Sequence, residues 1–191
     1  MTSDVQLRAD PFTHSSKTNL LAETLADKTL SWMERDAPWR LRIASFYEQW
    51  ELALDVECVP PELRELTAPR TIVRLIDTML KPITDRRLTL CEVTAHKLLV
   101  GQTIRIHNDF VGGEETHRLL VQLNRGWDDR KGGLLMLFGG ARAEEVRRAV
   151  RPLHRSAFAF EISPRSFHAV STIHQGERYT LVYSFKSHET Q

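Results

Sequence analysis

Residues 87–100 read Arg-Leu-Thr-Leu-Cys-Glu-Val-Thr-Ala-His-Lys-Leu-Leu-Val, and along this stretch apolar residues begin to alternate with polar ones. A period of two is typical of a strand with one buried face. Further short runs of this kind follow to the end of the chain, separated by Gly, Asn, Asp and Pro residues that favour turns. The predicted strands are 88–100, 103–108, 118–124, 134–138, 156–161, 167–172 and 178–186. Such a series predicts a jelly roll of two facing sheets.

Upstream of residue 87 the apolar residues recur at intervals of three and four, which is typical of helices with one buried face. The spacing predicts helices over 20–33, 39–56 and 72–80. Residues 1–17 are polar and show no apolar period, so we expect a loose or late-docking arm there. The charged segment 141–150, within a larger 141–151 insertion, is expected to form a short helix or a hairpin arm, and a role for it as a lid is left open.

These expectations combine into one domain over residues 1–191. A helical support at 18–86 would pack on a β core at 87–187, which is a double-stranded β-helix. The predicted class is α+β, mostly β, and cupin-like.

The composition of the chain argues against nucleic acids and membranes as partners. Lys plus Arg is 26 and Asp plus Glu is 25, for a net charge of +1, so the chain has no broad electrostatic attraction for nucleic acid or a membrane surface. The apolar runs are far shorter than the roughly 20 residues that a membrane span requires. Cys58 and Cys91 follow no metal-ligand spacing, and the N-terminus does not resemble a signal peptide. We therefore expect a cytoplasmic protein with a small-molecule or peptide-like substrate; the oligomeric state is left open.

A metal-ligand pattern begins where the predicted strand at 103–108 ends in His107-Asn108-Asp109. Because side chains alternate along a strand, His107 and Asp109 should project to the same face. His168 lies in another short predicted strand. Two histidines and one carboxylate leave three octahedral positions open, as in non-haem Fe(II) oxygenases. A zinc site would more usually close on four ligands.

The last predicted strand carries a second candidate site. Arg178 and Thr180 share one face of it. A guanidinium can fork onto a carboxylate with two parallel hydrogen bonds, and a hydroxyl two residues on can add a third. This pair therefore suits the far carboxylate of a dicarboxylate co-substrate, 2-oxoglutarate.

With these motifs in order, the chain from about residue 88 to 186 resembles an Fe(II)/2-oxoglutarate dioxygenase of the prolyl 4-hydroxylase type, similar to the hypoxia-sensing prolyl hydroxylases and their bacterial relatives. The resemblance rests on several pieces in register. Besides His107-Asn108-Asp109 these are 119–127 (LLVQLNRGW), 132–135 (GGLL), 157–160 (AFAF), 166–170 (SFHAV) and 177–181 (ERYTL).

The resemblance implies that His107, Asp109 and His168 are the catalytic metal ligands. It also implies Fe(II), 2-oxoglutarate and dioxygen as cofactors, with ascorbate as a reductant. The implied reaction is hydroxylation of an unactivated C–H bond. Halogenases of this group replace the ligand carboxylate by a small residue, so Asp109 favours hydroxylation.

Two positions depart from the family pattern. Gln122 and Lys97 stand where the family often has tyrosines, and both are candidate contacts of the co-substrate. The departures leave the substrate open between two choices. One is a prolyl or other residue in a peptide-like substrate, which we favour, and the other is a free amino acid or small natural-product intermediate. A non-catalytic jelly-roll binding module is the alternative from another class.

Other histidines of the chain fall outside this register. His96, His117, His154 and His174 are expected to lie at the surface and not to bind metal.

Overall fold

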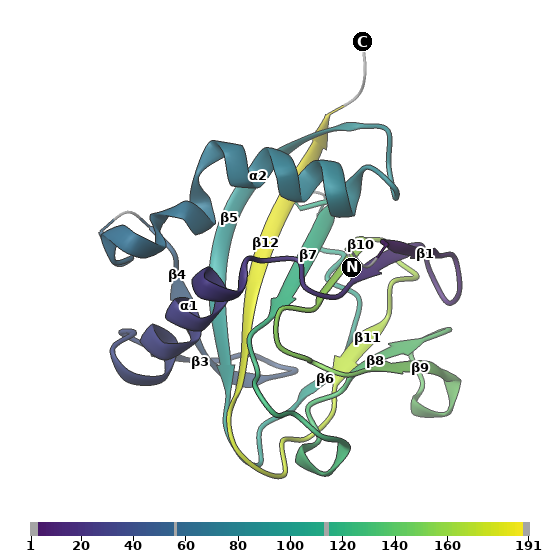
Figure 1. Ribbon diagram of the computed structural model, residues 1–191. Coiled ribbons are helices and arrows are strands. Elements are labelled where there is room, and N and C mark those ends of the chain that lie inside the picture. Colours follow the sequence, from purple (N-terminus) through teal and green to yellow (C-terminus); the bar gives the residue numbers. More distant parts are fainter. Residues whose placement is uncertain (1–3, 56, 113–114, 189–191) are drawn as a thin grey trace.

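A computed structural model describes residues 4–55, 57–112 and 115–188. Within these residues the strands form two antiparallel sheets (Figure 1). The larger sheet has the order β1-β2-β10-β7-β12-β5-β4-β3, and the smaller has the order β6-β11-β8-β9. This arrangement confirms the predicted mostly β jelly roll.

The bounds of the strands follow the sequence pattern closely from residue 87 onward. In the large sheet these strands are β5 Arg87–Leu98, β7 His117–Gln122, β10 Ala157–Glu161 and β12 Arg178–His188. The small sheet consists of β6 Ile104–His107, β8 Leu135–Phe138, β9 Val146–Val150 and β11 His168–Val170.

The segment 141–150 combines both structures that the sequence allowed. A single 3-10 turn at Ala143–Glu145 leads into β9, which pairs with β8 at the edge of the small sheet. Most of the segment is thereby tied into the small sheet.

A helical layer covers one face of the large sheet (Figure 1). It comprises α1 Glu23–Arg35, the 3-10 helix η1 Pro61–Thr67, α2 Pro69–Leu75 and the π-helical continuation η2 Ile76–Leu80. The predicted helices at 20–33 and 72–80 are thus confirmed. None of the described helices is long and apolar enough to cross a bilayer.

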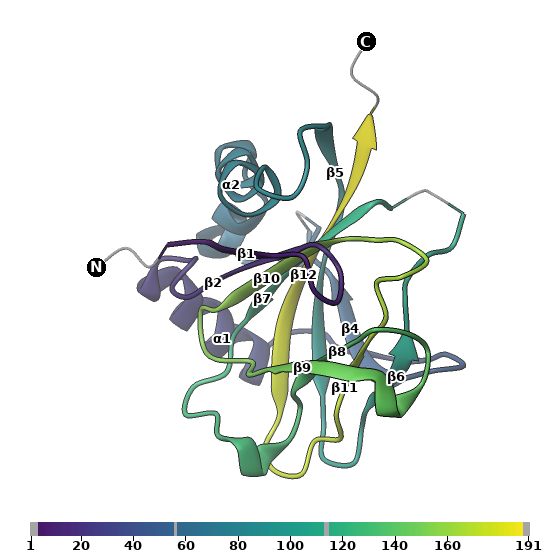
Figure 2. The ribbon, with the colours of Figure 1, turned by 90° about the vertical axis from the view of Figure 1, so that its right-hand side faces the viewer.

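Of the two alternatives for residues 1–17, the loose arm is wrong for the described residues, because they form strands of the large sheet. Residues 1–3 lie outside the described part of the chain, whereas Gln6–Arg8 forms β1 and His14–Lys17 forms β2. β2 pairs with β10 (Figure 2), and the Ser15 hydroxyl donates to the Met79 carbonyl at 2.6 Å. Its partners lie far along the chain, so local sequence carries no signal of the pairing.

The predicted helix at 39–56 is also wrong. Arg40–Ile43 forms β3 and Glu48–Ala53 forms β4, a hairpin that adds to the edge of β5. Val56, the last residue of that predicted helix, lies outside the described residues. The apolar spacing of this segment is compatible with a helix, but the free edge of β5 offers a row of backbone partners that a helix could not use.

Alternation along β12 divides the interior into two compartments. Tyr179, Leu181 and Tyr183 join the core under the helices. Residues of the opposite face, including Val182, pack toward the small sheet, where they meet Leu135 and Leu137 of β8. The second compartment therefore lies between the two sheets.

Candidate metal centre and co-substrate pocket

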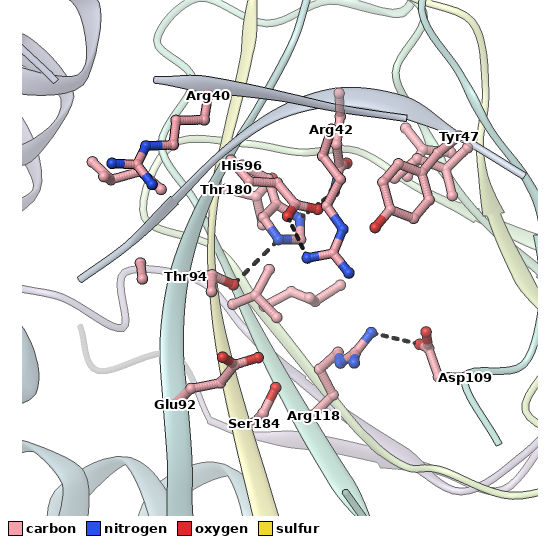
Figure 3. Close-up of a pocket in the computed structure, with 18 of the residues that line it drawn as sticks. Arg40, Arg42, Tyr47, Glu92, Thr94, His96, Asp109, Arg118, Thr180 and Ser184 are labelled. Atoms are coloured by element: carbon pink, nitrogen blue, oxygen red, sulfur yellow. Dashed lines mark hydrogen bonds and ion pairs between the residues drawn. The ribbon is translucent and has the colours of Figure 1, made fainter. Parts of the chain in front are cut away.

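A cavity of about 660 Å³ opens between the two sheets. Alternate residues of three neighbouring strands line it in rows (Figure 3). One row joins His96 of β5 to Thr180 of β12. A second row joins Glu92 of β5, Ser184 of β12 and Arg118 of β7, and we call this end the mouth of the cavity because Glu92 is exposed there.

The small sheet brings the candidate metal ligands to this cavity. β6 and β11 pair so that His107 lies opposite His168. Nε2 of His107 lies 3.4 Å from Oδ1 of Asp109, and Nε2 of His168 lies 3.2 Å from Oδ2. One ligand atom from each of the three residues lies within 4.8 Å of the others. The structure thus brings the three predicted ligands together.

Both histidines are oriented by backbone carbonyls. Nδ1 of His107 lies 2.9 Å from the carbonyl oxygen of Arg105, and Nδ1 of His168 lies 2.8 Å from that of Ser166. Protons on these Nδ1 atoms leave the Nε2 lone pairs facing the Asp109 carboxylate. Two imidazole nitrogens and a carboxylate oxygen gathered this closely form a donor set that fits Fe(II).

Asp109 reaches the site by a route that differs from the expected alternation. β6 ends at His107, and Asp109 has a left-handed backbone with φ of 57°. That conformation is uncommon for a residue other than glycine and is frequent at functional sites. A turn, and not a continued strand, therefore aims this carboxylate at the two imidazoles.

The protonation states also suit a metal. Burial by itself raises the pKa of Asp109, but the two imidazoles and the Arg118 guanidinium outweigh it and hold this pKa well below its usual range. Arg118 Nη1 lies 2.7 Å from Asp109 Oδ2. Burial lowers the pKa of His168. An ionised Asp109 carboxylate and a neutral His168 imidazole are the forms that bind a divalent ion.

Arg178 lies at the opposite end of the cavity from the mouth and is only 3% exposed. Its Nε donates to the Gly133 carbonyl at 3.0 Å, and its Nη1 donates to the Thr180 hydroxyl at 2.8 Å. No acidic side chain among the described residues forms an ion pair with it. Burial lowers its pKa to about 10. A buried guanidinium without a counter-ion fits the distal carboxylate of 2-oxoglutarate.

Gly133 positions the Arg178 side chain by accepting its hydrogen bond and by leaving space for it. Its φ is 62°, and a Cβ there would lie 2.7 Å from Ile173 Cδ1 and 3.0 Å from Arg178 Cδ. Only glycine allows the chain to pass this close to the arginine while presenting its carbonyl to it. The Gly132-Gly133 step of the sequence motif therefore has a direct function in the pocket.

Thr180 and Gln122 extend the hydrogen bonds of Arg178. The Thr180 hydroxyl donates to Gln122 Oε1 at 2.9 Å, across the pairing of β12 with β7. Thr180 lines the cavity that holds the candidate metal ligands. Gln122 lines a second cavity of about 450 Å³, and the two cavities share Leu135 as a lining residue. Gln122 therefore acts on the pocket through Thr180.

The structure does not bring Lys97 to this site, which corrects the expectation for that residue. Its ammonium lies 5.2 Å from the ring centre of Trp39 and 5.5 Å from that of Trp50. Strand alternation turns Lys97 away from the cavity and turns its neighbour His96 into it.

His96 is a cavity residue that sequence reasoning placed at the surface. It lines the pocket beside Thr180, and burial lowers its pKa to about 4. His117 is likewise buried, with a pKa lowered to about 4 by desolvation, but it lies outside the metal cluster. The period of two in β5 places His96, Thr94 and Glu92 on one face, and this signal was sufficient to find His96.

Arg118 is a second residue that sequence reasoning missed. It comes from β7 and pairs with both Asp109 and Glu115, the latter at 2.5 Å. These two ion pairs raise its pKa against the effect of burial. No local pattern in the sequence marks this contact, because Asp109 and Arg118 are not neighbours in the sequence and meet only in the folded chain.

Comparison with known proteins agrees with this geometry. Residues 92–186 match the model of the 2OG-Fe(II) oxygenase superfamily. No curated protein matches the chain.

Several solved structures share the fold. A Pseudomonas putida prolyl-4-hydroxylase is 17% identical, with a TM-score of 0.70 over 92% of this chain and 93% of that one. A Trichoplax adhaerens prolyl hydroxylase, in complex with a hypoxia inducible factor oxygen degradation domain peptide fragment, is 14% identical. Its TM-score is 0.72 over 91% of this chain and 83% of that one.

This family uses Fe(II), 2-oxoglutarate and dioxygen, for which the cavity offers a His-Asp-His cluster and an unpaired arginine. The chain belongs to the 2OG-Fe(II) oxygenase superfamily and is a dioxygenase.

Proposed function

We propose that His107, Asp109 and His168 hold Fe(II) and that Arg178 binds the distal carboxylate of 2-oxoglutarate, assisted by Thr180 and Gln122. The protein then hydroxylates an unactivated C–H bond in a peptide-like substrate, with a prolyl residue as the first candidate. One observation carries this proposal. A buried guanidinium, which has no acidic partner within the described part of the chain, shares a cavity with a cluster of two imidazoles and a carboxylate.

Each group has a separate task in this reaction. With iron bound, 2-oxoglutarate and dioxygen are converted to succinate and carbon dioxide, and one oxygen atom enters the substrate C–H bond as a hydroxyl. Arg178 fixes one end of the co-substrate and so sets the direction in which its other end points. Leu120, Leu135 and Val182 line the cavity between the two ends and exclude water from it.

Two features support a peptide-like substrate. The Trichoplax relative of similar fold holds a peptide fragment. In this chain large apolar side chains are exposed beside the site: Leu41 and Ile43 on β3, at 46% and 72%, and Phe110 immediately after Asp109, at 51%. Exposed apolar residues around a cavity favour a partner that covers more surface than a small metabolite does.

The test is an assay with Fe(II), ascorbate, 2-oxoglutarate and a panel of prolyl peptides, other peptides and free amino acids. We expect succinate to form together with a peptide product heavier by one oxygen atom, measured by mass spectrometry. A reaction without 2-oxoglutarate is the control. Oxidation of free amino acids alone would contradict the peptide assignment, and the absence of both succinate and bound iron would contradict the site assignment.

A further inference from the structure

At the mouth of the cavity lies a buried hydroxyl that the reaction described above does not use. Ser184 is 1% exposed and lines the cavity. Its hydroxyl makes no hydrogen bond with any described side chain or backbone group. Buried polar groups are nearly always hydrogen-bonded in folded proteins. Ser184 is therefore suited to a polar group that enters the cavity from outside.

Glu92 stands next to this hydroxyl on the neighbouring strand. It pairs with Ser184 across β5 and β12, and both point into the cavity (Figure 3). The pairing shifts by one residue directly beyond this point, so that Leu90 is the partner of Phe185. Leu90 packs in the helical core. Glu92 is the last residue of β5, toward the start of the strand, that lines the cavity.

Glu92 is also the acid of the cavity that lacks a partner within the described residues. Asp109 and Glu115 pair with Arg118, and Glu51 pairs with Arg42 at 3.5 Å. The carboxylate of Asp55 accepts hydrogen bonds from the backbone N–H groups of Glu57 and Cys58. Arg118, at the far end of the row from Glu92, is already paired with two acids. At the mouth, Glu92 is therefore an exposed carboxylate that forms no ion pair with any described residue.

We propose that Glu92 and Ser184 form a subsite for a cationic nitrogen, an ammonium group of the substrate. Glu92 supplies the opposite charge, and the Ser184 hydroxyl oxygen accepts a hydrogen bond from one ammonium N–H group. This inference rests on the proposed function, because it assigns the chemical class of the substrate that enters the same cavity. Two sources share that chemistry: a basic side chain within a peptide and a free α-ammonium group.

The position of the subsite fits this role. Ser184 lies in one cross-strand row with Arg118, and Arg118 contacts the candidate ligand Asp109. Val182 and Leu120 form the next row inward. A substrate whose nitrogen sits at Glu92 would therefore extend its carbon chain over aliphatic side chains beside the metal centre.

The test measures binding without turnover. The full-length protein is loaded with Mn(II) and 2-oxoglutarate under nitrogen, and three lysine-sized probes are titrated by ligand-observed NMR. N-acetyl-lysine methylamide carries a side-chain ammonium, norleucine methylamide carries only an α-ammonium, and N-acetyl-norleucine methylamide carries neither. We expect one of the two ammonium probes to bind about 10-fold more tightly than the uncharged one, and its identity distinguishes the two sources.

Variants then assign the preference to these residues. Glu92→Gln should remove most of the 10-fold preference, and Ser184→Ala should reduce it about threefold, corresponding to one weak neutral hydrogen bond. Glu62→Gln changes an exposed glutamate on η1 and should retain the full preference. Equal or undetectable binding of the three probes, or a preference that survives Glu92→Gln, would overturn the subsite. Failure of the wild-type protein to bind 2-oxoglutarate in the same titration would instead overturn the proposed function.

Discussion

Two arginines mark the two ends of the cavity, the buried Arg178 and the half-buried Arg118, and their surroundings are opposite. Arg178 has no acidic partner among the described residues, and burial lowers its pKa to about 10. Arg118 pairs with Asp109 and Glu115, and its pKa is raised. A buried charge that lacks a partner is costly, whereas a paired one is held in place by its partners. The difference indicates that Arg178 is kept for a ligand and that Arg118 organises the protein itself.

The comparison extends to the neighbours of each arginine. Arg178 is positioned by neutral groups, the Gly133 carbonyl and the Thr180 hydroxyl, so it keeps its charge for an incoming anion. Arg118 spans the loop that begins at Asp109, which has a left-handed backbone conformation. Its ion pair therefore restrains a candidate metal ligand that lies outside regular structure.

The largest effect should come from the ligands that lie between the two arginines. His168→Ala or Asp109→Ala should lower 2-oxoglutarate consumption by at least about 1,000-fold, because two remaining ligands hold the ion too weakly. Mn(II) binding followed by EPR should be lost in parallel, while circular dichroism shows a retained fold. Turnover within 10-fold of wild type in both variants would show that the metal lies elsewhere.

Arg178→Gln tests the unpaired arginine. We expect the KM for 2-oxoglutarate to rise about 100-fold, because charge-assisted bonds to the distal carboxylate are lost. The free energy of unfolding of the protein without ligand should not fall, since a buried uncompensated charge is removed. Both quantities can be measured on one preparation, by steady-state kinetics and by urea unfolding. An unchanged KM would refute the assignment of Arg178.

Arg118→Gln is the matched substitution at the other end. It leaves Asp109 and Glu115 without their cation, and we expect the free energy of unfolding to fall by about 2 kcal/mol. The KM for 2-oxoglutarate should rise far less than in Arg178→Gln. If the two variants changed stability and KM alike, the distinction between a ligand-binding and an organising arginine would be lost.

The smallest effect is expected at Lys97, which faces away from the cavity. Lys97→Met should leave the KM for 2-oxoglutarate within about twofold of wild type and cost about 0.5–1 kcal/mol of stability through the lost contacts with Trp39 and Trp50. The same assays as for Arg178 measure both. A large increase in the KM for 2-oxoglutarate would instead show that Lys97 contributes to co-substrate binding.

Much of the β core was predictable because its signals are local. Alternation from residue 87 onward placed β5, β7, β10 and β12 within a few residues of their observed bounds. The strand positions of His107 and His168 could be predicted for the same reason. Asp109 reaches the site as predicted but by a left-handed turn, which the sequence pattern does not reveal.

The errors concern segments whose structure depends on distant partners. The residues of β3 and β4 have an apolar spacing that suits a helix, and those of β2 have no periodic pattern. Both segments become strands because open sheet edges, at β5 and β10, supply their hydrogen bonds. The side-chain contacts of Arg118 and Lys97 could not be predicted from the sequence either, because each residue contacts side chains that are not adjacent in the sequence and come close only on folding.

The sequence by itself determined the class of the fold, the identity of the candidate metal ligands and the arginine for a dicarboxylate, because periodicity and residue chemistry are properties of short segments. Tertiary structure alone decided which charges are compensated. Arg118 has two partners while Arg178 has none among the described residues, and Glu92 stands without a counter-ion beside a buried hydroxyl. The physical reason is that the free energy of a charge depends on burial and on neighbours within a few ångströms, and only folding sets these.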